Sequence, residues 1–188
     1  MRQLFALMII VMAISCGDSG SEESMAKKDR LDLINELEQR AFKDADNFDT
    51  TTALSLVNNY AKFSDENPDD ELTPYYLFKA GDMAMALHKP HRAIEYFDKV
   101  IDKYPDYEKV PYCMFLKGFV YEDQIRDLEK AKESYEAFIE KYPDHDMTEA
   151  ARFSIKNLGK SPEDLIKEFE EKVNRKLEEE NTSTQEES

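Results

Sequence analysis

The chain carries a helical pattern in which apolar and aromatic residues recur at spacings of three and four. Three Pro-Asp pairs punctuate this pattern, at residues 68–69, 105–106 and 143–144, so the pairs are 37 and 38 residues apart. An aromatic or apolar residue stands eight and five positions before each proline, and these residues are Tyr60 and Phe63, Phe97 and Val100, and Tyr135 and Phe138. A period of this length is typical of stacked helical hairpins, so we predict that these positions form the core.

A second set of residues repeats with the same period. Pro74, Tyr75, Phe78 and Gly81 recur 37 positions later as Pro111, Tyr112, Phe115 and Gly118. Both glycines fall inside predicted helices, where glycine costs about 1 kcal/mol relative to alanine. We therefore interpret Gly81 and Gly118 as points of close approach by a paired helix, with the small residues Ala93 and Ala131 expected opposite them. Thr73 is predicted to cap the N-terminus of the helix that follows it.

These residues together resemble the tetratricopeptide repeat. The first copy of the pattern comprises Gly81, Ala93, Phe97 and Pro105, and the second comprises Gly118, Tyr121, Ala131, Tyr135 and Pro143, with one extra residue between the helices. The resemblance implies an all-α fold, a right-handed superhelix of antiparallel helical hairpins. It also implies that the first helix of each hairpin lines a concave face.

The repeat domain is expected to span residues 29–177 and to hold about three to four hairpins. A first, degenerate hairpin is predicted over 29–45 and 51–63, and a last one over 147–158 and 161–180. Terminal repeats are often atypical.

The last hairpin departs from the pattern because Lys156 stands near the expected glycine. Ser161, followed by proline and acids, predicts a strong helix start. An apolar stripe then runs through Leu165, Ile166, Phe169, Val173 and Leu177. We interpret this as a helix that caps the end of the array, and residues 178–188 as a disordered acidic tail.

The N-terminus has the layout of a secretory signal peptide over residues 1–15. Arg2 precedes an uninterrupted apolar run over residues 4–14, which is followed by Cys16. That run reaches only about 16 Å as a helix, too short to cross a bilayer core. Residues 13–16, Ala-Ile-Ser-Cys, resemble the lipobox of bacterial lipoproteins, which implies cleavage before Cys16 and attachment of lipid to it. An ordinary signal peptide with an unmodified cysteine is the alternative.

Residues 16–28 are predicted to be the lipidated cysteine followed by a flexible tether. The lipobox resemblance implies the bacterial cell envelope, and because Asp18 does not directly follow the cysteine, we favour the outer membrane, at its periplasmic face or the cell surface. The Lys-Tyr-Pro-Asp endings at 103–106 and 141–144 resemble repeats of two envelope proteins. These are the lipoprotein of the outer-membrane β-barrel assembly machine and the periplasmic protein that accompanies the Tol–Pal system.

Composition and motifs argue against several other functions. The formal net charge of −16 repels phosphate backbones, so nucleic acid is an unsuitable partner. The sequence carries no nucleotide-binding or catalytic motif, and we expect neither enzymatic activity nor a cofactor other than the lipid on Cys16. His88 and His91 flank a predicted turn but have no third metal ligand nearby. Cys113 is predicted to be a small core residue.

The resemblance therefore implies a membrane-anchored scaffold that binds envelope proteins or peptides, in outer-membrane protein assembly or envelope maintenance. The predicted groove residues are Tyr75, Phe78, Asp82, Met85, Tyr112, Phe115, Phe119 and Glu122. Aromatic rings beside acids suit a segment with apolar and basic side chains. Ordinary packing of these rings between repeats is the competing interpretation. A structural homo-oligomer without a groove, built through the helix at 29–45 or 161–180, and an enzyme or solute-binding lipoprotein remain open.

Overall fold

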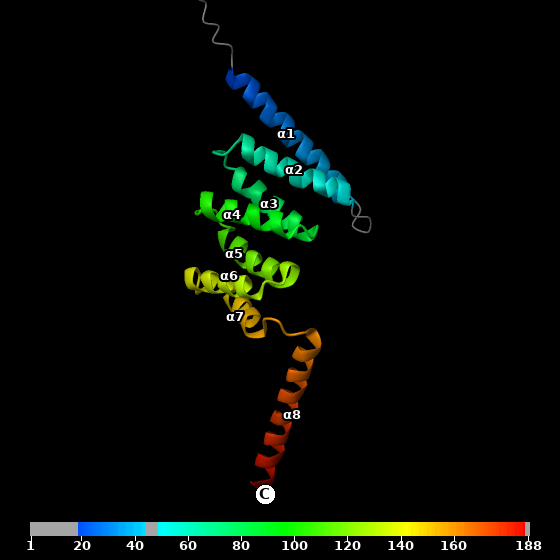
Figure 1. Cartoon of the computed structure of the whole chain (residues 1–188), viewed down its shortest axis with the longest axis vertical. Helices are drawn as coiled ribbons and strands as arrows, with labels where there is room; N and C mark the ends of the chain where they lie inside the picture. Colours follow the sequence, from blue (N-terminus) through cyan, green and yellow to red (C-terminus); the bar gives the residue numbers. More distant parts are fainter. Residues whose placement is uncertain (1–18, 44–48, 187–188) are drawn as a thin grey trace, which may run out of the picture.

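The computed structural model describes residues 19–43 and 49–186, which form a stack of helices. The elements are α1 (Ser19–Ala41), α2 (Thr50–Glu66), α3 (Thr73–Ala86), α4 (Pro90–Lys103), α5 (Val110–Phe119), the π-helical η1 (Val120–Ile125), α6 (Leu128–Lys141), α7 (Thr148–Asn157) and α8 (Pro162–Glu186). Consecutive helices from α1 to α7 pack against one another along the long axis of the molecule (Figure 1). The expected all-α array of antiparallel hairpins is confirmed. No helix in the described part of the chain is both long enough and apolar enough to span a membrane.

The core follows the period that the prolines mark. The six residues predicted to be buried eight and five positions before each Pro-Asp pair are all fully shielded from solvent. They lie on α2, α4 and α6, the second helices of the hairpins. Cys113 is also buried, as predicted, and burial raises the pKa of its thiol to about 12. Apolar contacts repeated along the stack therefore hold the array together.

The two repeated glycines do mark close approach, although the partner differs from the one expected. A Cβ atom added at Gly81 would lie 2.5 Å from the Phe97 ring, and one at Gly118 would lie 2.7 Å from the Tyr135 ring. The alanines expected opposite them, Ala93 and Ala131, are buried elsewhere on the same helices. The space left by each missing side chain is filled by an aromatic ring rather than by an approaching backbone.

Thr73 is not an N-cap, so that prediction is wrong. It lies in the first turn of α3, fully buried, and Leu72 occupies the capping position without a side-chain cap. The Thr73 hydroxyl instead donates a hydrogen bond to the carbonyl of Asn67, across the preceding loop. Thr148 repeats the arrangement on α7, donating to the carbonyl of Tyr142 at 2.8 Å. Both hydroxyls tie the end of one hairpin to the start of the next.

The extra residue between the helices of the third hairpin is accommodated in η1. Gly118 follows Gly81 by 37 residues, whereas Arg126 follows His88 by 38, so the insertion lies between these points. His88 and Arg126 both adopt the left-handed conformation, with φ of 52° and 64°. The helix absorbs the insertion by widening into a π-turn and still ends at the equivalent residue.

The last helix does not cap the array, which corrects the prediction for the apolar stripe. α8 points away from the stack (Figure 1), and Ile166, Phe169 and Val173 are 59%, 68% and 39% exposed. Lys156 provides a physical reason, because it occupies the position of Gly81 and Gly118. A side chain there blocks the place where the second helix of each of the two central hairpins packs an aromatic ring.

The ends of the helices also differ from the sequence predictions. α1 begins at Ser19, inside the expected tether, and α8 continues to Glu186 through the expected disordered tail. The predicted start of α8 is confirmed, because the Ser161 hydroxyl accepts the Asp164 N–H at 3.1 Å and Asp164 accepts the Ser161 N–H at 3.2 Å. The predicted signal peptide and Cys16 lie outside the described residues.

Candidate functional site

Three of the predicted groove residues are exposed on α3 and α5, the first helices of the two central hairpins. Tyr75 is 41% exposed and Phe119 is 38% exposed, and Asp82 is also exposed. Asp82 and Phe119 occupy equivalent positions, 37 residues apart, on neighbouring repeats. Tyr75 and Asp82 are two helical turns apart on α3, so they share one side of that helix. We call Tyr75, Asp82 and Phe119 the first-helix face.

The other two predicted phenylalanines are occupied in packing. Phe78 is half-buried, with its ring centroid 6.4 Å from that of Phe97. Phe115, equally half-buried, lies 5.4 Å from the ring of Tyr135 and 6.0 Å from that of Phe138. Each ring covers the aromatic residue of its own second helix. These two residues hold the hairpins together and offer little surface to a partner.

Tyr112, Met85 and Glu122 are likewise half-buried. Tyr112 makes an edge contact with the ring of His145 at 5.3 Å, and Met85 packs against the core. Glu122 accepts a hydrogen bond from the Tyr135 hydroxyl at 2.8 Å. The carboxylate of Glu122 therefore supports the hairpin from which it comes.

A polar cluster beside Tyr75 was not predicted from the sequence. Glu38 on α1 accepts the Tyr60 hydroxyl at 2.7 Å and also binds the Lys79 ammonium group. The ammonium nitrogen lies 5.3 Å from the centroid of the Tyr75 ring, within cation–π distance. Burial opposes the charge on Lys79, but the hydrogen bond and charge of Glu38 outweigh it and raise the lysine pKa. Lys79 therefore remains cationic and holds Tyr75 at the edge of the face.

The electrostatics of the first-helix face are set by Asp82. The groups around Asp82 displace part of the water near its carboxylate, although the side chain is exposed, and this desolvation raises its pKa; the positive charge of Lys79 partly opposes the rise. No side-chain ion pair joins Asp82 to another described residue. An ionised carboxylate on the first-helix face favours a ligand that brings a basic group together with apolar surface.

Nothing among the described residues forms a metal-binding group of three or more histidine, cysteine or acidic side chains. His88 lies in the left-handed turn after α3 and is exposed, as is His91. The first-helix face can bind a partner by non-covalent contacts only. It provides two aromatic rings and one carboxylate, and Lys79 packs against one of the rings.

The stack of antiparallel hairpins and the repeated glycine–aromatic contacts define a helical repeat array. Residues 75–107 and 112–145 match the tetratricopeptide repeat family, and these segments contain most of α3 with α4 and most of α5 with α6. These two segments are tetratricopeptide repeats. No curated protein matches the chain significantly.

Repeats of this family typically serve as scaffolds for protein–protein interaction and not as enzymes. They stack into extended surfaces to which partners bind. The class of partner is therefore protein, and the exposed residues of α3 and α5 are the natural candidates for contact.

Proposed function

We propose that this protein is a lipid-anchored scaffold of the bacterial cell envelope, in which the first-helix face binds a segment of a partner protein. The observation that carries the binding proposal is the exposure of Tyr75, Asp82 and Phe119 on two matched repeats, while their neighbours are occupied in packing. Exposed aromatic residues contribute strongly to protein interfaces. The partner segment carries apolar and basic side chains, which complement the two rings and the carboxylate.

The anchor rests on the resemblance of residues 13–16 to a lipobox. Several acyl chains on Cys16 give stable attachment to a membrane, and attachment raises the local concentration of the scaffold there. We place the protein at the outer membrane, on its periplasmic face or at the surface. Assembly of outer-membrane proteins or maintenance of the envelope is the process that the resemblance of the repeat endings favours.

The binding proposal is tested by placing a photo-crosslinking amino acid at Phe119 in living cells. We expect a discrete crosslinked partner, which mass spectrometry identifies, and we expect Asp82→Lys to remove it by reversing the charge on the first-helix face. Phe42, 59% exposed just after α1 ends, provides a control position at another exposed phenylalanine. Equal crosslinking from Phe42 and Phe119, or an unchanged adduct with Asp82→Lys, contradicts the proposal.

The anchor is tested separately. Cys16→Ser is expected to abolish fatty-acid labelling and release the protein from membranes, whereas Cys113→Ala is expected to change neither. Because Cys113 is buried in α5, it serves as a control for loss of a thiol alone. If Cys16→Ser stays in the membrane fraction after a high-salt wash, the lipid anchor is wrong, whatever the result of crosslinking.

A further inference from the structure

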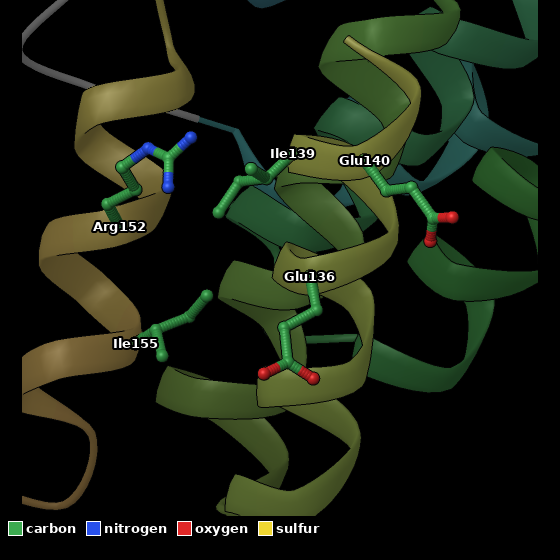
Figure 2. Close-up of a pocket in the computed structure, with 5 residues that line it drawn as sticks. All are labelled: Glu136, Ile139, Glu140, Arg152 and Ile155. Carbon is green, nitrogen blue, oxygen red and sulfur yellow. The ribbon is translucent and has the colours of Figure 1, made fainter. Parts of the chain in front are cut away.

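The C-terminal end of the stack contains an open groove between α6 and α7. The groove encloses about 420 Å³ and is lined by Glu136, Ile139, Glu140, Arg152 and Ile155. Ile139 of α6 and Ile155 of α7 point into the space between the two helices, with Arg152 above Ile155 on the same helix (Figure 2). The floor of the groove is therefore apolar and its edges are charged.

The preceding repeat shows what such a groove holds. Shifting Ile139, Arg152 and Ile155 back by 38 residues gives Ile101, Met114 and Lys117, which line the equivalent groove between α4 and α5. There, Ser134 and Ala137 of α6 lie over the groove, and the remaining hollow is only about 100 Å³. In the preceding repeat, the equivalent surface is therefore covered by the helix α6.

The helix that would follow in this position is α8, and in the structure it lies elsewhere. α7 has 10 residues, against 14 in α3, and α8 continues away from the stack (Figure 1). The exposed stripe of α8 consists of Ile166, Phe169 and Val173. The α6/α7 groove is therefore not covered by a helix, and the apolar side of α8 is largely exposed.

The charges beside the groove and beside the stripe are complementary. By helical periodicity, the stripe of α8 has Glu163 and Glu170 along one side and Lys172 and Lys176 along the other. The groove has two acids on its α6 side, Glu136 and Glu140, and one base on its α7 side, Arg152. A helix placed with its lysines over α6 and its glutamates over α7 satisfies both sides at once.

Two of the groove charges already have partners within their own helices. Glu136 lies 3.7 Å from Lys132, and Arg152 lies 3.5 Å from Glu149. All four side chains are more than half exposed. Such exposed intrahelical pairs are worth only a few tenths of a kcal/mol and are easily exchanged for new ones.

We propose that two copies of this chain form a reciprocal dimer in which the α8 helix of each copy occupies the α6/α7 groove of the other. Exchange of the two α8 helices fills both grooves and covers both apolar stripes, as expected for a closed two-fold assembly. This interface lies at the C-terminal end of the stack, away from the first-helix face, and does not depend on the proposed function.

The test uses two charge-reversed forms of the full-length chain in mild detergent. One form carries Glu136→Lys with Glu140→Lys in the groove, and the other carries Lys172→Glu with Lys176→Glu on α8. Native mass spectrometry measures the assembly state, with one form labelled with nitrogen-15, and circular dichroism checks that both forms retain their helices. Because all four residues are exposed, we expect the substitutions to leave the fold intact.

We expect the unmodified chain to be dimeric. Each reversed form alone is expected to be monomeric, because like charges would then face each other in both groove–helix contacts of its dimer. Mixing the two forms is expected to give a heterodimer. One of its groove–helix contacts has the native charges, and the other has the charges reversed on both sides. A monomeric unmodified chain overturns the proposal. Dimers of either reversed form alone indicate pairing of α8 with α8 and also overturn it, as does a mixture that stays monomeric.

Discussion

The Cβ atom that Gly81 lacks would lie 2.5 Å from Cε1 of Phe97. Phe97 is completely buried, so its ring has no open space into which to move. The same contact recurs between Gly118 and Tyr135, at 2.7 Å. In each of the two central hairpins, an aromatic ring of the second helix thus packs directly against a glycine of the first helix.

Gly81→Ala and Gly118→Ala are therefore expected to destabilise the protein. Alanine in a helix gains about 1 kcal/mol over glycine, but overpacking of a tight core costs about 1–3 kcal/mol. Because both rings are buried, we expect overpacking to outweigh the helix propensity of alanine and the free energy of unfolding to fall by up to about 2 kcal/mol. Urea denaturation measures this fall.

A double-mutant cycle identifies the cause. Phe97→Leu is expected to lose less stability in the Gly81→Ala background than in the unmodified chain, because the smaller side chain accepts the added methyl group. Additive effects of the two substitutions would mean that the contact does not determine the stability of the hairpin.

The glycine period explains why much of the fold was predictable from the sequence. The requirement for a small residue under an aromatic ring is local and repeats with the hairpin, so it leaves a regular signal at Gly81 and Gly118. The buried rings beneath the Pro-Asp turns give a second signal in the same register. These two patterns correctly predicted the hairpins and the core.

The remaining features depend on contacts that have no period. Lys79 meets Glu38 across 41 residues, and the equivalent of Lys79 in the next repeat is Leu116, so no pattern marks this pair. The placement of α8 depends on Lys156, whose effect follows only once the ring position in the other hairpins is known. Exposure of Phe119 and packing of Phe115 likewise depend on which rings the second helices supply.

The hydrogen bond between Glu122 and Tyr135 has an apolar counterpart in the preceding repeat. There the equivalent residues are Met85 and Phe97. Glu122→Met alone leaves the buried Tyr135 hydroxyl without its acceptor, which costs about 1–3 kcal/mol. Glu122→Met combined with Tyr135→Phe reproduces the apolar pair and is expected to recover at least half of that loss.

Thermal and urea unfolding of the two single variants and the double variant measure the coupling. A double variant that loses as much stability as the sum of the single variants would show that the bond is dispensable. Met85→Glu, which places an unpaired carboxylate beside Phe97, is the reverse control and is expected to destabilise the preceding hairpin.

Stability is expected to fall in alkali because two buried tyrosines donate to carboxylates. Burial, followed by the hydrogen bond to its glutamate, raises the pKa of Tyr60 and of Tyr135 above the ordinary value of 10.0. The folded protein therefore keeps these protons when the unfolded chain has lost them. The stabilisation is complete below pH 10 and is lost as the pH rises above it, by up to about 1.4 kcal/mol per pH unit for each tyrosine.

Urea midpoints at pH 8 and pH 11 check this dependence. Tyr135→Phe is expected to lower the midpoint at pH 8 but to reduce the further fall at pH 11. Tyr75→Phe, at an exposed tyrosine on the same array, is the comparison and is expected to change the alkaline fall less than Tyr135→Phe does. Equal alkaline falls in all three proteins would contradict the role of the buried hydroxyl.

Glycine at the two left-handed turn residues is expected to stabilise the array. His88 and Arg126 have φ of 52° and 64° where α3 and η1 end. A side chain in this conformation costs about 1–2 kcal/mol, and glycine adopts it freely but increases the entropy of the unfolded chain. His88→Gly and Arg126→Gly should therefore each gain about 0.5–1 kcal/mol.

The sign of the effect depends on the backbone conformation, and neighbouring positions test this. Ala86→Gly, two residues before His88 and still within α3, is expected to lose about 1 kcal/mol because the helix there needs no positive φ. Gly159→Ala is also expected to destabilise, because Gly159 has φ of 78° and an added Cβ would lie 2.9 Å from Leu128. Calorimetric melting temperatures that fall for His88→Gly as they do for Ala86→Gly would show that the imidazole contributes more than the strain it imposes. Higher melting temperatures for His88→Gly and Arg126→Gly would instead show that the left-handed conformation of the turn residue destabilises both hairpins.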